Sequence, residues 1–149
     1  MASQLIENHR VAAEIYHGEA LCRQKAWELL EEPCLPKGLF PIDMVEFGCN
    51  GSSGFVWAKH KEQVKHKFKR INKTVPYDTE VTAFFKKRRL TNVTGIKSKE
   101  LLLWVTISNI FIDDPSSGKI TFQVPNGMSA MLPTSAFELE ENKVLCLEN

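Results

Sequence analysis

The sequence lacks the cysteine pairs, long apolar runs and targeting segments that define several protein classes. Its four cysteines, Cys22, Cys34, Cys49 and Cys146, form no C-x-x-C pair and have no histidine at zinc-ligand spacing, so no metal site is expected. The longest apolar run, Leu101–Val105, is too short to cross a bilayer, so no transmembrane segment is expected. The first ten residues contain no apolar core of signal-peptide length, which favours a cytoplasmic protein.

Motifs of the common enzyme classes are absent too. There is no G-x-S-x-G elbow, phosphate-binding loop, dinucleotide fingerprint or H-E-x-x-H motif. The segment Gly51-Ser52-Ser53-Gly54 has the wrong spacing for an elbow and lies between two expected strands, which indicates a turn. His66 shares a strand face with Val64 and Phe68, so a core or rim histidine is expected rather than a base. We therefore predict no catalytic residue, metal ligand or cofactor.

The composition that remains is that of an ordinary globular protein. The chain has 149 residues, of which 43% are hydrophobic and 25% are charged. This length fits one domain that needs no disulfide or metal for stability. We expect a helical segment over residues 1–32, a β domain over 33–138 and an acidic tail over 139–149.

The N-terminal segment has a helical pattern over residues 3–32. Gly18 is expected to end or kink a first helix, because glycine is the usual left-handed residue at a helix C-terminus. Pro33 is expected to end a second helix, because proline disfavours helix in the residue before it. Trp27 and Leu30 are predicted to be buried against the β domain.

From Met44 onward, short alternating segments separated by turn residues predict strands. Residues 101–107 are apolar on both faces and predict a central strand. The other predicted strands cover 44–49, 55–60, 64–68, 81–85, 109–113, 119–124 and 129–132. No βαβ alternation is present. The predicted fold class is mainly β (α+β), with the N-terminal helical segment capping an antiparallel β-barrel or sandwich-like domain.

Charge is strongly segregated along the chain. Residues 59–99 contain 13 Lys and Arg against 3 Asp and Glu, whereas the segments on either side are net acidic. One interpretation is that lysines keep a half-exposed strand soluble. The other is an anion-binding face that includes Lys65, Lys67, Lys69, Arg88 and Arg89. Alternation predicts that the three lysines project together.

The anion on such a face is expected to be a lipid surface or a small amphipathic molecule. Five or six Lys or Arg near an anionic leaflet, at about 1 kcal/mol each, would give reversible association. No RNP, KH or zinc-finger pattern is present, so nucleic acid is not expected. Trp57 and Trp104 belong with other aromatics to the strands. They either fill the core or line an apolar pocket with a basic mouth, which would suit an amphipathic ligand with an acidic head.

An ordered series of short motifs resembles the plant family called domain of unknown function 538. The motifs are the segments 35–41 (LPKGLFP), 54–57 (GFVW), 94–97 (TGIK), 101–105 (LLLWV) and 132–137 (LPTSAF). The resemblance implies a mostly β, barrel-like domain. It also carries two proposals about the family, a likeness to bactericidal/permeability-increasing lipid binders and hydrolysis of chlorophyll esters. Many members begin with a signal peptide, which this sequence does not show. The family offers no agreed catalytic motif to transfer.

Three functional hypotheses remain open at this stage. The leading one is a non-enzymatic binding module for a lipid-like or other amphipathic anionic small molecule, because apolar strand faces lie beside the basic segment. An esterase acting on a similar ligand, such as a chlorophyll ester, is the second. A scaffold that contacts protein partners through an exposed face is the third.

Overall fold

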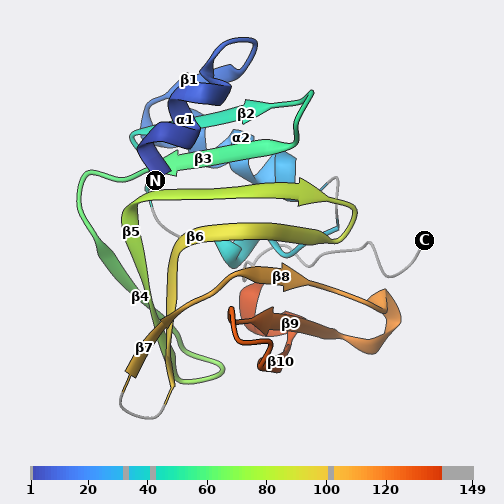
Figure 1. Ribbon diagram of the computed structural model, residues 1–149. Coiled ribbons are helices and arrows are strands. Elements are labelled where there is room, and N and C mark those ends of the chain that lie inside the picture. The colour runs from blue at the N-terminus through green and yellow to red at the C-terminus, as the bar shows by residue number, and fades with distance from the viewer. Residues whose placement is uncertain (1, 32–33, 41–42, 101–102, 139–149) are drawn as a thin grey trace.

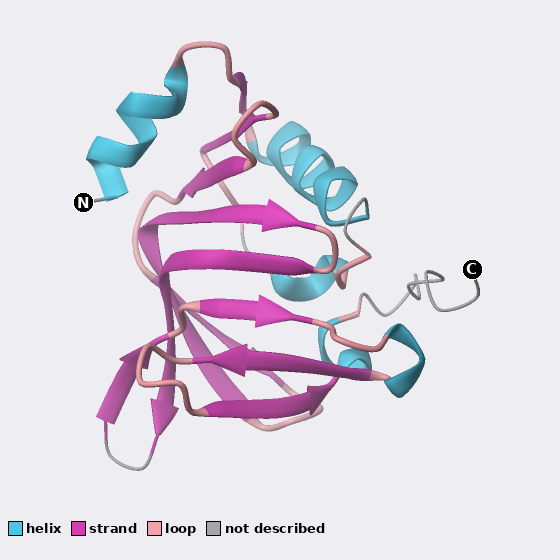
Figure 2. Cartoon of the chain, turned by 45° about the vertical axis from the view of Figure 1, so that its right-hand side comes forward, coloured by secondary structure: helices cyan, strands magenta, loops and turns pink. Residues whose placement is uncertain are grey.

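A computed structural model describes residues 2–31, 34–40, 43–100 and 103–138 of the chain. Two α-helices and three short 3-10 turns accompany ten strands in this part of the protein (Figures 1 and 2). The helices and turns are α1 (Ala2–Arg10), α2 (Glu19–Glu31), η1 (Lys37–Leu39), η2 (Pro115–Ser117) and η3 (Thr134–Phe137). The strands are β1 (Glu14–His17), β2 (Glu46–Asn50), β3 (Phe55–Lys59), β4 (Val64–Phe68), β5 (Lys73–Lys86), β6 (Arg89–Glu100), β7 (Leu103–Thr106), β8 (Asn109–Phe111), β9 (Lys119–Gln123) and β10 (Ser129–Pro133).

Neighbouring strands pair in an antiparallel manner throughout. The order is β1-β2-β3-β5-β6-β8-β9-β10, with β4 added to β5 and β7 added to β6. Within the described residues this path does not return to its first strand, so the sheet is open. The predicted class, a mainly β fold with N-terminal helices and an antiparallel sheet, is confirmed. The structure is compatible with a sandwich-like arrangement or an open barrel.

Strands β5 and β6 are long and bent, and the bend gives the sheet two halves (Figure 1). The first part of β5 pairs with β4, whereas its second part pairs with β3. Gly95 lies near the bend with φ of +84°. A side-chain carbon at Gly95 would lie 2.3 Å from the carbonyl oxygen of Glu80, so only glycine allows the two backbones to approach here.

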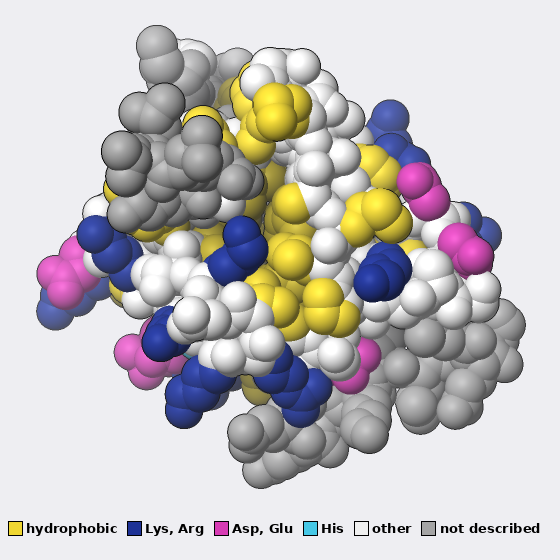
Figure 3. Space-filling view, turned by 90° about the horizontal axis from the view of Figure 1, so that it is seen from below, with side chains coloured by type: hydrophobic (Ala, Val, Ile, Leu, Met, Phe, Trp, Pro, Cys, Tyr) yellow, Lys and Arg dark blue, Asp and Glu magenta, His cyan; other side chains and the backbone are white. Residues whose placement is uncertain are grey.

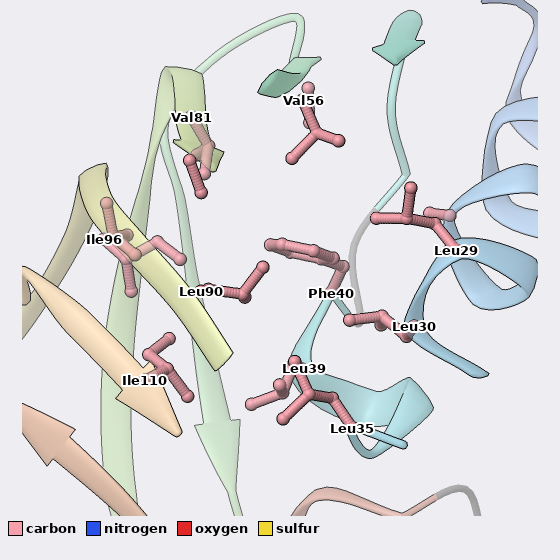
Figure 4. Packing of buried hydrophobic residues seen from close by; sticks show 14 of the residues in the cluster. Leu29, Leu30, Leu35, Leu39, Phe40, Val56, Val81, Leu90, Ile96 and Ile110 are labelled. Atoms are coloured by element: carbon pink, nitrogen blue, oxygen red, sulfur yellow. The ribbon is translucent and has the colours of Figure 1, made fainter. Parts of the chain in front are cut away.

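The main core lies between the sheet and the α2–η1 segment (Figure 4). Leu29 and Leu30 of α2 point into it, as do Leu35, Leu39 and Phe40 from the segment that follows. The sheet contributes Val56, Val81, Leu90, Ile96 and Ile110. α2 ends at Glu31, as Pro33 predicts. The helical segment therefore covers the sheet as expected.

The two residues predicted to anchor α2 differ in the structure. Leu30 is fully buried, as predicted. Trp27 is only half-buried and does not belong to the main cluster, and its buried indole N–H has no hydrogen-bond partner among the described residues. The prediction for Trp27 is therefore wrong in its degree of burial, because the buried stripe of α2 passes through Cys22, Ala26, Leu29 and Leu30.

The helical pattern predicted for residues 3–32, with an end or kink at Gly18, is wrong just before that glycine. α1 ends at Arg10, and residues 14–17 form β1, which pairs with β2. Gly18 has φ of +94° and does mark a boundary, but it joins a strand to α2 instead of ending a helix. Four residues carry too little periodicity to identify a strand, and the hydrogen bonds that stabilise β1 come from distant residues of β2.

α1 covers a second, smaller apolar cluster on the other side of β3. Phe55 and Trp57 point toward Ile6 of α1, whereas Val56 and Ala58, which alternate with them, point into the main core. β3 is therefore buried on both faces. Gly48 on β2 lies opposite Trp57, and a side-chain carbon there would overlap the indole ring at 2.1 Å.

The predictions for the other strands have different outcomes. The hairpins around residues 50–54 and 114–118 and the strand over 64–68 are confirmed. The central strand predicted over 101–107 is wrong where it can be compared, because β7 pairs with β6 and with no other described strand. Leu101 and Leu102 lie outside the described residues, as does the predicted acidic tail over 139–149.

Candidate functional site: an apolar groove with a basic rim

An apolar groove opens at the end of the molecule where β4 and β7 lie. Its walls come from the first part of β5, the last part of β6, β9 and β10, with Phe137 of η3 at one side. The lining residues are Ile71, Lys73, Val75, Ser98, Ile107, Phe122, Val124, Ala130, Leu132 and Phe137. Viewed from this end, hydrophobic side chains gather in the middle, and Lys and Arg side chains stand around them (Figure 3).

The groove is shallow. Its enclosed part has a volume of about 30 Å³. That is room for a water molecule or two, whereas sites that engulf a drug-sized ligand have about 300–1,000 Å³. The enclosed part can therefore hold a small apolar group, and the rest of a ligand would lie outside it.

An aromatic contact fixes the side of the groove formed by η3. The ring of Phe137 lies 4.8 Å from that of Phe68 and 5.1 Å from that of Phe122, measured between centroids. The Arg70 guanidinium donates a 2.9 Å hydrogen bond to the carbonyl oxygen of Ser135. η3 is thus tied to the β4–β5 turn and to β9, which keeps the two walls together.

Two polar side chains interrupt the apolar lining. Lys73 is half-buried at the first residue of β5, opposite Phe68, and Ser98 lies on β6 opposite Val105. Within residues 2–31, 34–40, 43–100 and 103–138, no ion pair joins Lys73 to a carboxylate. Its ammonium is therefore available to an anionic group at the groove. The sequence analysis did not name Lys73, although its position two residues before Val75, on the same strand face, was a readable signal.

The three lysines predicted to project together are not all on one strand. Lys65 and Lys67 are exposed on the outer face of β4, and their alternation with buried or half-buried neighbours is as expected. Lys69 is exposed in the turn after β4, which ends at Phe68. The basic strip on the strand therefore has two members.

Arg88 and Arg89 lie at the opposite end of β5 from these lysines. Lys65 pairs with Pro76, whereas Arg89 pairs with Lys86, so as much as about 30 Å of strand separates them. Arg89 bonds the carboxylate of Asp113 at 3.5 Å and lies over the ring of Phe111. The structure therefore does not bring Arg88 and Arg89 together with the other candidate residues.

The two candidate tryptophans also occupy different environments. Trp57 is 1% exposed in the cluster under α1, so it does not line the groove. Trp104 on β7 is 43% exposed, and the ammonium of Lys65 lies 5.6 Å from its ring centroid. Trp104 and Lys65 are thus in contact, at the same end of the molecule as the groove.

A buried carboxylate that the sequence analysis missed is Glu46 on β2. Its oxygens accept hydrogen bonds from Trp57 at 2.8 Å, Arg10 at 3.0 Å and His17 at 3.0 Å, and the Lys59 ammonium lies 3.8 Å away. Burial favours the neutral acid, but these donors outweigh it and hold the pKa of Glu46 below its usual value. Its partners are dispersed over residues 10–59, so no sequence motif signals the cluster.

The described residues show no arrangement typical of a hydrolase or a metal site. The histidine rings of His9 and His60 bond backbone carbonyl groups, and that of His17 bonds Glu46. His66 contacts the ring of Phe68. In this part of the chain no serine or cysteine bonds a histidine, and no cluster of potential metal ligands occurs. None of the helices described is both long and apolar enough to cross a bilayer.

Comparison with known proteins places this fold in a family. Residues 26–138 match the family described as "Protein of unknown function, DUF538". The chain belongs to this family. It is also 32% identical over 117 residues to the Arabidopsis thaliana protein described as "Uncharacterized protein At5g01610", which covers 77% of this chain and 64% of the relative.

The DUF538 match includes every wall of the groove but not α1 or β1. This chain spans a little under two thirds of the length of the Arabidopsis relative. No solved structure matches the chain. The resemblance to this plant family seen in the sequence is confirmed.

Proposed function

We propose that the protein is a non-enzymatic binding module for a slender amphipathic molecule with an anionic head. The observation that carries this proposal is the open apolar groove with Lys73 in its wall. An aliphatic chain would lie along the groove between β5 and β10, and the ammonium of Lys73 would attract the anionic group. The small enclosed volume favours a single chain over a lipid with several chains.

Binding is favoured over ester hydrolysis by the groups around the groove. Ser98 is the hydroxyl in the lining, and an esterase would need a base beside it. No histidine lines the described walls, and among the described residues none hydrogen-bonds Ser98.

A cytoplasmic location, expected from the sequence, is part of this proposal.

A fluorescent fatty acid tests the proposal directly. Wild-type protein should bind cis-parinaric acid more tightly than its neutral methyl ester. Lys73→Gln should weaken binding of the acid about five-fold, equivalent to about 1 kcal/mol for a partly exposed ion pair, and leave the ester unchanged. Fluorescence titration of the two probes measures both constants.

A matched pair of substitutions on β10 locates the site. Ala130 lines the groove opposite Phe122, whereas Met131 points outward and is 65% exposed. Ala130→Phe should fill the groove and abolish binding of both probes, and Met131→Phe should bind both as wild type does. Equal binding by wild type and Ala130→Phe would show that the groove is not the site.

A further inference from the structure

We propose that Trp104, Lys65 and Lys67 form a docking face for an anionic lipid bilayer, at the end of the molecule that also carries the groove. This inference rests on the proposed function, because the bilayer would be the source of the amphipathic ligand. The three residues lie on β7 and β4, at the end of the molecule where the groove opens (Figure 1). We call them the docking face.

Trp104 has the properties of an interfacial anchor. A tryptophan 43% exposed on a short strand leaves a large apolar surface in water. Indole rings are enriched where hydrocarbon meets lipid headgroups, because the ring is apolar and its N–H is polar. The Lys65 ammonium over this ring would remain at the headgroup level while the ring enters the interface.

The charges of the docking face are not neutralised by the neighbouring strand. Lys65 pairs with Pro76 and Lys67 with Thr74, so no carboxylate stands opposite either lysine on β5. Over the described ranges, neither lysine takes part in an ion pair. Both are exposed. Lysines in this state are attracted to the negative potential of phosphatidylserine-rich membranes.

The docking face and the groove lie on opposite faces of the same strands. Thr74, the partner of Lys67, lies between the groove residues Lys73 and Val75, so Lys67 and Thr74 point away from the groove. Val105, next to Trp104, pairs with the groove residue Ser98, so Trp104 points away from the groove as well. A bilayer that contacts Trp104 and Lys67 would therefore meet the outer face of these strands, at the end of the molecule where the groove opens.

A bilayer suits this surface better than a nucleic acid does. Single-stranded nucleic acids bind to successive exposed aromatics on which bases stack. Here Lys65 covers one side of the Trp104 ring, and Phe68 is buried while Phe122 lines the apolar groove. A single exposed indole beside two lysines offers no row of stacking platforms to successive bases, whereas it suits the interface between lipid headgroups and acyl chains.

Vesicle co-sedimentation tests the docking face. Wild-type protein should bind vesicles of phosphatidylcholine mixed equally with phosphatidylserine, and not vesicles of phosphatidylcholine alone. Lys65→Gln/Lys67→Gln should weaken binding about twenty-five-fold, at about five-fold for each lysine. Binding should weaken with salt, because exposed charges are screened over about 8 Å at physiological ionic strength.

The matched control removes two charges from the other end of β5. Lys86 and Lys87 are exposed there, so Lys86→Gln/Lys87→Gln has the same net charge as the first variant. It should bind vesicles as wild type does. Equal weakening by both variants would show attraction by net charge alone and would overturn the docking face.

The position of Trp104 gives a second readout. Vesicles with brominated acyl chains should quench the tryptophan emission of wild-type protein, and Trp104→Phe should abolish this quenching, because Trp57 is buried and the half-buried Trp27 lies on α2, outside the docking face. Quenching that persists in Trp104→Phe would overturn the proposal. So would tighter binding to a single-stranded oligonucleotide than to the vesicles.

The outcome is separable from that of the proposed function. Cis-parinaric acid binds in solution without vesicles, so Lys65→Gln/Lys67→Gln should retain that binding. Ala130→Phe should lose the probe but keep its vesicle binding. If no variant loses vesicle binding while the groove still binds cis-parinaric acid, the docking face is refuted and the proposed function is not.

Discussion

Glu46 shows how a single carboxylate can join elements that are far apart in the sequence. Its partners Arg10, His17 and Trp57 belong to α1, β1 and β3, and Glu46 itself belongs to β2. A buried acid is costly unless donors compensate it, and here three side chains do so. The residues that cover the outer side of β3 are therefore held by one group.

Replacing this carboxylate should be strongly destabilising. Glu46→Gln places an amide N–H among cationic donors and leaves part of the Arg10 charge without its partner. We expect a loss of about 3 kcal/mol in the free energy of unfolding, measured by urea titration. Glu7→Gln is the control, because Glu7 bonds the same Arg10 but its side chain is 65% exposed. That variant should lose less than about 0.5 kcal/mol. Similar losses in both would contradict a central role for Glu46.

Residue-level features were only partly readable from the sequence. Alternation correctly placed Lys65 and Lys67 on one exposed strand face. It could not show that the Lys65 ammonium lies over Trp104, because this contact joins β4 to β7, which are separated along the chain by β5 and β6. Trp57 and Trp104 are both strand tryptophans, and only the three-dimensional packing of α1 makes one buried and the other exposed.

Among the elements, α2 shows that residues of one helix can differ in burial, because only one side of the helix faces the core. Leu30 is fully buried in the main core, and Trp27 is half-buried outside it. Leu30→Ala should cost about 3 kcal/mol of unfolding free energy through lost burial and the cavity left behind. Trp27→Ala should cost less than about 2 kcal/mol, since less of its surface is removed from water. A larger loss for Trp27→Ala in urea titrations would contradict this packing.

The elements that sequence reasoning missed share a physical cause. β1 has four residues, and its stability comes from pairing with β2 about thirty residues away. The segment around Trp104 is as apolar as a buried strand. Among the described strands, however, β7 pairs only with β6. Apolar composition indicates what a segment can bury, whereas its place in the sheet depends on the bends of β5 and β6. Residues 64–68, with strict alternation and clear turns, were predicted with the observed bounds.

At the scale of the whole molecule, the segregated charge seen in the sequence has more than one structural role. The basic segment spans β4, β5 and most of β6, so it reaches both ends of the sheet. At one end Lys65 and Lys67 are exposed on the outer face of β4, and at the other Arg89 bonds Asp113. Net charge along the sequence therefore indicated an anionic partner, but the bent strands decide which charges act together.

The stability of the whole protein should fall when the pH drops from 7 to 5. Burial lowers the pKa of His60, although its bond to the Asp78 carbonyl group opposes this, and burial also lowers the pKa of His66. Their folded pKa values thus lie below the unfolded value of 6.5, so the unfolded chain binds more protons as the pH falls through and below 6.5. Stability present at neutral pH is lost in this window, by at most about 1.4 kcal/mol per pH unit for each histidine. The depressed pKa of Glu46 acts in the same direction but only at lower pH.

His60→Asn isolates one contribution to this pH dependence. The Nδ1 atom of His60 donates a 2.8 Å hydrogen bond to the carbonyl oxygen of Asp78, and an asparagine amide can donate from nearly the same position. The variant lacks a titrating group, so its unfolding free energy should change less between pH 7 and 5 than that of wild type, whatever its absolute stability. Adding His66→Asn should further reduce the change in unfolding free energy between pH 7 and 5. Urea titrations at a series of pH values measure these slopes. A slope in His60→Asn as steep as in wild type would mean that the buried imidazole is not what makes the fold sensitive to mild acid.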